Sequence, residues 1–252
     1  MTSDGLLLKP LRGVPAVTPG MDLAQLTLAA LASAGEPLRA HDVLVFAQKI
    51  VSKAEGRSVE LASVTPSARA LTVAAQTGKD ARLVELVLQE SDAILRQREG
   101  LLIVRHRLGF SLANAGIDAS NVEAGSVLLL PVDPDASAAR IREALRARTG
   151  VDVGVLIIDS LGRPWRMGSV GTAIGVSGLP ALLDLRGQPD LNGRLLESTE
   201  IGLADELAAA ASLMMGQAAE GTPIVLARGV PYARQEGSAR DLLRPQAKDM
   251  FR

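Results

Sequence analysis

The apolar run from Val153 to Ile158 most constrains the fold of this chain, because it is short and has no alternating polar residues. Such a run is typical of a strand buried on both faces, which needs other layers of structure on each side of it. The run ends at the acid Asp159. In α/β proteins, ligands bind at the carboxyl ends of such strands, so Asp159 is the first candidate for a functional residue.

Other predicted strands and helices alternate irregularly along the chain. Short apolar runs predict strands at 43–46, 101–104, 127–130 and 224–227. Apolar residues at helical spacing, together with capping residues, predict helices that start at Asp22, at Thr65-Pro66, after Gly78 (reaching Leu95), over 134–148, and from Leu203 to Gly216. Glycine-bearing segments at 108–125 and 160–180 are predicted as long loops. We therefore expect a mixed α/β (α+β) fold with irregular mixed sheets, and no regular doubly wound sheet.

Composition excludes several classes of function. The absence of Cys excludes disulfides, zinc–cysteine sites, iron–sulfur clusters and thiol nucleophiles. A formal net charge of -1 and an aromatic content of 2% argue against nucleic-acid binding. No apolar stretch reaches the length of a membrane span, and the start of the chain does not resemble a signal peptide. We expect a single unit over residues 1–252, located in the cytoplasm, with no membrane or nucleic-acid partner.

A polar, small-residue segment at 114–121 contains the second candidate acid, Asp118, and the amide Asn121. Together with Asp159 these side chains offer only oxygen ligands, which suit Mg²⁺ or Mn²⁺ bound with substrate phosphates. Two structural alternatives stay open, because Asp118 and Asn121 can simply form Asx-turns and Asp159 can cap the next turn. Zinc is disfavoured, since the chain has no Cys and only two His, His41 and His106. Both histidines are expected at the surface.

Candidate phosphate contacts come from a different segment. Lys49 and Lys53 lie directly after the strand at 43–46, in or beside the sequence VSKAEGR, where a solvated charged turn is the alternative to a phosphate site. No Walker A or G-x-G-x-x-G pattern is present. The glycines of SVGTAIGVSG have the wrong spacing for a nucleotide loop, so we expect them to serve close packing. No Ser-His-Asp arrangement supports covalent catalysis.

Four segments, in order, carry a resemblance to a known family: VSKAEGR, NAGIDASNVEAGS, DSLGR…GSVGTAIGVSG and LMMGQAAEGTP. From about Leu11 to Arg228 the chain resembles the coenzyme F-420 gamma-glutamyl ligases. The resemblance implies a GTP-dependent ligase that adds one or more L-glutamates to the deazaflavin coenzyme precursor through an acyl phosphate. It also implies two ions of Mg²⁺ or Mn²⁺, K⁺, two lobes and an intertwined homodimer, and we expect no fused flavin reductase domain.

The resemblance also assigns residues. The metal ligands would be Asp118, Asp159, Ser160 and Gln217. The GTP contacts would be Val14, Pro15, Ala16, Val17, Gln48, Lys49, Lys53, Asn121, Met215, Gly216, Gln217, Ala218, Ala219, Glu220, Gly221 and Thr222. Some relatives carry Ser-Thr at the positions of Gln48 and Lys49, which puts those two contacts in doubt. Arg163 and Arg166 are candidates for binding anionic substrate, with solvated surface cations as the alternative.

Two other functions stay open at this level. The same acids and lysine would serve a different carboxylate-activating or phosphoryl-transferring enzyme on this scaffold, which nucleotide and acceptor preference would distinguish. A nucleotide- or coenzyme-binding protein without turnover would explain a weakened metal site at Gln217. Against it, Asp118, Asp159 and Lys53 are all kept.

The departure at Gln217 generates a prediction, because archaeal relatives often have Glu there. An amide oxygen can bind a hard cation but supplies no charge, so the second metal should bind more weakly here than in a Glu-bearing relative. Gln217→Glu should therefore raise the affinity for Mn²⁺, measured by calorimetric titration. An unchanged or lower affinity would contradict this expectation.

Overall fold

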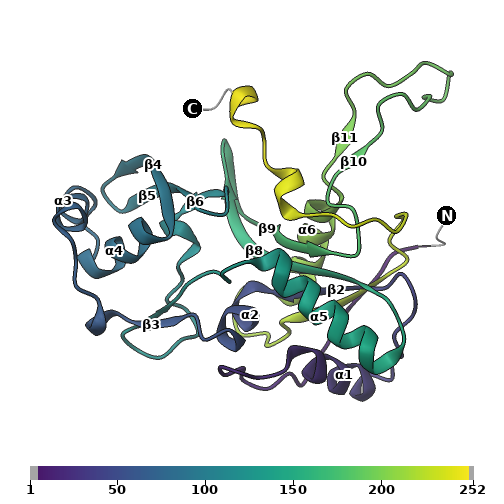
Figure 1. Ribbon diagram of the computed structural model, residues 1–252, viewed down its shortest axis with the longest axis horizontal. Coiled ribbons are helices and arrows are strands. Elements are labelled where there is room, and N and C mark those ends of the chain that lie inside the picture. The colour runs from purple at the N-terminus through teal and green to yellow at the C-terminus, as the bar shows by residue number, and fades with distance from the viewer. Residues whose placement is uncertain (1–4, 250–252) are drawn as a thin grey trace.

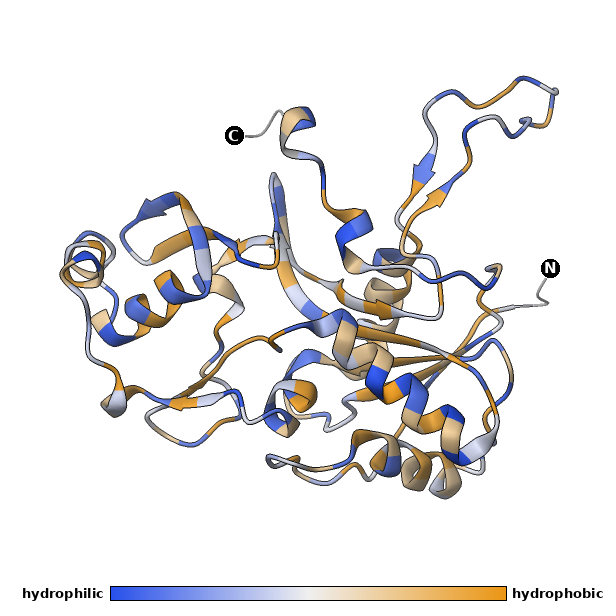
Figure 2. Ribbon diagram, in the orientation of Figure 1, coloured by the Kyte–Doolittle hydropathy of each residue, from blue (hydrophilic) through white to orange (hydrophobic). Residues whose placement is uncertain are grey.

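The computed structural model describes residues 5–249 and is built around a five-stranded mixed sheet (Figure 1). The strands lie in the order β1-β12-β2-β8-β9, and only β2 and β8 are parallel. Figure 2 shows much of this sheet in hydrophobic colours. The bounds are β1 Leu7–Pro10, β2 Val43–Ala47, β8 Gly154–Arg163, β9 Arg166–Ser177 and β12 Ile224–Arg228. The expected mixed α/β class with irregular mixed sheets is confirmed.

Four helices accompany the central sheet: α1 Leu23–Ser33, α2 Gln48–Ala54, α5 Pro134–Thr149 and α6 Leu203–Met215. In Figure 1, α5 crosses in front of the sheet and α6 lies behind it. Both approach β9 closely at glycines: a Cβ at Gly171 would lie 2.4 Å from the Ala208 carbonyl oxygen of α6, and one at Gly175 would lie 2.5 Å from the Pro134 oxygen of α5. These glycines of SVGTAIGVSG therefore serve close packing, as expected.

A second hydrophobic cluster lies beside the central sheet, to the left in Figure 1. It is formed by α3 Ala68–Thr77, α4 Ala81–Gln89 and two small sheets. The three-stranded sheet contains β4 Ser91–Arg98, β5 Leu101–His106 and β6 Ser111–Ala113, and the two-stranded sheet pairs β3 Ser58–Glu60 with β7 Ser126–Leu128. We call the part of the chain from 57 to 130 the small lobe.

Helix boundaries follow local capping chemistry. The Asp22 side chain accepts from Gln25 N–H at 3.0 Å and starts α1, as predicted. Gly78 and Gly150 end α3 and α5 in the left-handed conformation, which glycine adopts without steric cost. The predicted start at Thr65-Pro66 is wrong by a few residues, because Ser67 caps α3.

Two predictions from periodicity are wrong. Leu95 does not continue a helix, because α4 ends at Gln89 and the following residues form β4, paired with β5. The segment 160–180 is not a long loop. It contains most of the β8–β9 hairpin, whose glycines allow helices to pack directly on the strand backbone. Tertiary contact, which local spacing does not report, decides both cases.

Two further segments lie outside the sheet and helices described so far. Strands β10 Leu183–Asp184 and β11 Glu200–Ile201 form the base of an arm that projects outward (Figure 1). After β12, the chain from 229 to 249 crosses back over β9. Within residues 5–249, every helix is too short or too polar to cross a bilayer.

The close packing at Gly171 predicts a specific sensitivity to substitution. Gly171→Ala should lower the free energy of unfolding by about 1–3 kcal/mol, because the new methyl group would meet backbone atoms of α6 that cannot rotate away. Gly162→Ala, in the same hairpin with open space around the new methyl, is the matched control and should change stability little. Urea unfolding of both variants measures the difference, and equal stabilities would contradict the packing argument.

Candidate functional site

A cavity of about 520 Å³ lies at the end of β2 and beside the middle of β8, where the parallel pairing of the two strands stops. The prediction that the second strand ends before Asp159 is wrong, because β8 continues to Arg163 through its pairing with β9, so Asp159 lies within the strand. Ala47, the last residue of β2, pairs with Ile158 of β8, so the residues that follow each of them enter the same space. The wall is formed by five separate segments of the chain: Val14–Val17, Ala47–Ile50 with Lys53, Asn121, Ile158–Ser160, and the stretch that contains Ser212 and Met215–Pro223. Every residue predicted to contact GTP lines this cavity, and so do Asp159, Ser160 and Gln217.

Asp159 is the deepest acid of the site. It keeps some exposed surface toward the cavity, but protein surrounds it elsewhere, and this burial raises the pKa of its carboxyl group. The nearby negative charge of Asp118 raises the pKa further, whereas Ser160 N–H, which donates to Oδ1 at 2.8 Å, and the charge of Lys49 oppose the shift. A cation that binds near this carboxylate would stabilise its charged form.

Asp118 belongs to the small lobe, where its backbone pairs with Leu128 on β7. Its Oδ1 accepts from Ser120 N–H at 2.6 Å, so the Asx-turn that stood as the structural alternative is present. Its Oδ2 lies 2.7 Å from Lys49 Nζ of α2. Burial alone would raise the pKa of Asp118, but the hydrogen bonds from Lys49 and Ser120 hold it below its usual value.

The oxygen atoms of Asp159, Ser160 and Gln217 are of the kind that a hard divalent cation prefers as ligands. Ser160 Oγ donates to Gln217 Oε1 at 2.7 Å, which brings a hydroxyl and an amide oxygen beside Asp159. Among residues 5–249, no group of three acid, His or Cys side chains converges to hold a metal. Two carboxylates with neutral oxygens, water and substrate phosphate form the kind of coordination shell that Mg²⁺ or Mn²⁺ accepts.

Helix α2 starts directly after β2 and directs its two lysines at the loop containing Asn121. Lys53 Nζ donates to the Asn121 carbonyl oxygen at 2.6 Å, and Lys49 Nζ donates to Ser120 Oγ at 2.5 Å. The neighbouring Gln48 side chain is buried and donates to Ser52 Oγ at 2.7 Å. Because that side chain is used internally, only the backbone of Gln48 is well placed for a ligand.

The loop after α6 forms the opposite wall. Gly216 ends the helix with a φ of 73°, and the Glu220 side chain folds over it so closely that a Cβ would lie 2.1 Å from its carboxyl carbon. Glu220 Oε2 accepts from Ala218 N–H at 2.8 Å. Ser212, which the sequence analysis did not predict, also lines the cavity. It lies one helical turn before Met215, so helical spacing from that predicted contact would have indicated it.

Two predicted assignments lie elsewhere. Arg163 and Arg166 are paired at the turn of the β8–β9 hairpin, exposed and outside the cavity wall. His106 is fully buried, so its expected surface position is wrong. Its Nδ1 accepts from Leu108 N–H at 3.0 Å and its Nε2 lies 3.5 Å from Glu90, inside an ion-pair cluster of the small lobe that local sequence could not reveal.

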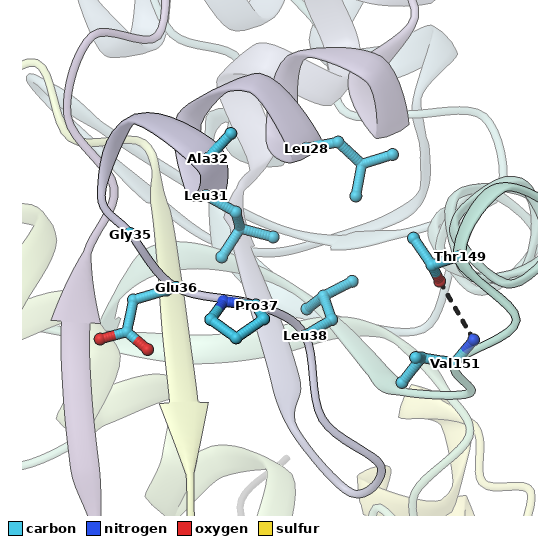
Figure 3. Close-up of a pocket in the computed structure, with 9 residues that line it drawn as sticks. All are labelled: Leu28, Leu31, Ala32, Gly35, Glu36, Pro37, Leu38, Thr149 and Val151. Carbon is cyan, nitrogen blue, oxygen red and sulfur yellow. Dashed lines mark hydrogen bonds between the residues drawn. The ribbon is translucent and has the colours of Figure 1, made fainter.

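A second cavity, of about 460 Å³, lies between α1 and the end of α5 (Figure 3). Its wall is mainly apolar, and its acid Glu36 is already paired with Lys9 and Arg228. Its wall lacks a set of reactive or metal-binding groups, so the cavity at the end of β2 is the candidate functional site.

Comparison with known proteins identifies one family. The family model for F420-0:Gamma-glutamyl ligase matches residues 13–229. The chain is 48% identical to the coenzyme F420:L-glutamate ligase of Methanothermobacter thermautotrophicus over 250 residues, which is 98% of this chain and 99% of the relative. It is 49% identical to the enzyme of that name from Methanopyrus kandleri (94% and 93% covered) and 44% identical to that from Archaeoglobus fulgidus (96% and 95% covered).

The burial of Asp159 predicts that its charge lowers the stability of the folded protein when no cation is bound. Asp159→Asn should stabilise the metal-free protein by roughly 1 kcal/mol, or about 2–4 °C, because it removes a desolvated charge and keeps the oxygen that Ser160 N–H needs. This difference in stability between variant and wild type should be absent well below the ordinary carboxyl pKa of 3.8, where Asp159 is protonated in the folded and the unfolded protein. It should be complete above the raised pKa of the folded protein, where wild type carries the buried charge. Thermal unfolding across pH, in chelator, measures it; a variant less stable at neutral pH would contradict this view.

Proposed function

Because the chain belongs to the F420-0:gamma-glutamyl ligase family, we propose that it joins L-glutamate to the deazaflavin coenzyme F-420 precursor, using GTP. The observation that supports GTP as the co-substrate is the composition of the cavity. Two lysines, a glycine-bearing loop and two carboxylates from distant segments line or border one space. This combination suits a triphosphate with a divalent cation.

We propose an acyl-phosphate route for the reaction. A carboxylate oxygen of the acceptor attacks the γ-phosphorus of GTP, and GDP leaves. The amine of glutamate then attacks the acyl carbon, phosphate leaves, and the amine loses a proton as the amide forms. In this route Lys53 and Lys49 offset the charge of the phosphates, and the loop from Met215 to Thr222 contacts them through its backbone. The route requires no nucleophile from the enzyme.

Asp118, Asp159, Ser160 and Gln217 would hold Mg²⁺ or Mn²⁺, in two ions. The cations would supply charge neutralisation for the triphosphate and the transferring phosphoryl group. We also propose that K⁺ assists, and we assign it no residues. Arg163 and Arg166 stay candidates for acceptor binding only if the acceptor reaches from the cavity along β8 to the hairpin turn.

We propose a homodimer as the working assembly. Large apolar side chains are exposed on the two projecting elements: Met167 is 95% exposed beside the hairpin turn, and Leu191 is fully exposed on the arm. Exposed apolar side chains on extended elements favour burial against a partner chain. Light scattering of the purified protein measures the assembly.

The proposed reaction predicts a defined product. Incubation with the coenzyme precursor, L-glutamate, GTP and Mn²⁺ should add mass in steps of one glutamyl unit, detected by mass spectrometry. Asp159→Asn should reduce the yield by at least about a hundredfold, because one carboxylate ligand of the cation is lost. If folded, metal-loaded wild-type protein adds no mass, the proposal fails, and nucleotide consumption with other carboxylate acceptors becomes the measurement that identifies the substrate.

A further inference from the structure

We propose that Lys49 and Lys53 act as a latch on the 118–121 loop, and that Lys49 and a divalent cation compete for the carboxylate of Asp118. The release of Lys49 from Asp118 then couples nucleotide binding to cation binding. The inference rests on the proposed function for its nucleotide, but the competition at Asp118 is a property of the chain that can be measured without one.

The latch joins two parts of the molecule that are distant in sequence. Lys49 and Lys53 are four residues apart, so they lie on the same face of α2. Lys49 holds the loop at two points, since its Nζ is 2.7 Å from Asp118 Oδ2 and 2.5 Å from Ser120 Oγ. Lys53 holds it at one, with Nζ 2.6 Å from the Asn121 carbonyl oxygen. The loop itself is anchored to β7 of the small lobe through the backbone of Asp118.

The contacts of the two lysines with the loop can be replaced by contacts with a phosphate group. The Lys49 and Asp118 side chains are 30% and 38% exposed, and ion pairs with that much solvent access contribute little to stability, so this pair can open without unfolding the loop. Both lysines also line the cavity beside the loop at 216–221. A phosphate group with several negative oxygens is a stronger partner for them than one carboxylate or one carbonyl oxygen.

The charges near Asp118 make the exchange cooperative. Asp118 and Asp159 are close enough for each charge to affect the other, and Lys49 is the cation that acts on both. If Lys49 moves to a phosphate, the two carboxylates lose that positive charge and their affinity for a divalent cation rises. Conversely, a cation on Asp118 frees Lys49 for phosphate. By linkage, each ligand must then strengthen the binding of the other.

The test is a thermodynamic cycle on the full chain. Mn²⁺ affinity is measured by electron paramagnetic resonance, with and without GDP, for wild type and Lys49→Met. The proposal expects Lys49→Met to bind Mn²⁺ alone roughly tenfold more tightly than wild type, because the competitor for Asp118 is gone. It also expects the factor by which GDP strengthens Mn²⁺ binding to become smaller.

Lys53→Met is the matched control, since Lys53 lies on the same helix face and contacts a carbonyl oxygen of the loop instead of Asp118. It should weaken GDP binding while its affinity for Mn²⁺ alone stays within about twofold of wild type. Lys49→Arg keeps the charge and should keep Mn²⁺ affinity close to the wild-type value. Lys49→Gln is a second neutral variant, and circular dichroism checks that each variant is folded.

The outcomes separate the alternatives. If Lys49→Met weakens GDP binding but leaves Mn²⁺ affinity unchanged or lower, Lys49 is an ordinary phosphate contact and the latch is overturned. If wild type binds Mn²⁺ but no GDP, the proposed nucleotide is wrong, while tighter Mn²⁺ binding by Lys49→Met would still support the competition at Asp118.

Discussion

The site depends on one interaction, the parallel pairing of β2 with β8. This pairing sets Ala47 beside Ile158, residues that are separated in sequence by the whole small lobe and α5. Helix α2, which carries the two lysines, follows β2 directly. Asp159 and Ser160 are the next residues of β8, so they lie beside the start of α2. Because β2 and β8 run in the same direction, the chain after Ala47 and the chain after Ile158 continue toward the same side of the sheet, so the acid Asp159 and two lysines share one cavity.

The position of β8 depends in turn on β9 and on how closely helices pack against it. Glycine at 171 and 175 lets α6 and α5 contact the strand backbone from different sides. The helices also satisfy its free N–H groups: Asp205 Oδ1 accepts from Ala173 N–H at 2.9 Å, and Asp135 Oδ1 accepts from Val176 N–H at 2.8 Å. An edge strand held in this way keeps the hairpin, and with it Ser160 and the end of α6, in register.

Electrostatics give the cavity its chemical character. Burial makes Asp159 costly to ionise, and Lys49 of α2 partly offsets the negative charge contributed by Asp118. The small lobe supplies Asp118 and Asn121, and the part of the chain around the central sheet supplies the other residues of the candidate site, so the site is assembled across two hydrophobic clusters. Relative motion of the clusters would therefore change the spacing of the two carboxylates.

The sequence by itself determined the parts that depend on neighbours along the chain. The apolar run before Asp159, the cap at Asp22 and the glycine ends of α5 and α6 were all readable, because strand burial and helix capping leave local patterns. The set of site residues was also readable, but through resemblance to a family. Only the tertiary structure decided that residues near 95 form a strand, that 160–180 contains a hairpin, that His106 is buried and that Lys49 pairs with Asp118. These features arise from contacts between residues far apart in the chain, and spacing along a sequence carries no information on such contacts.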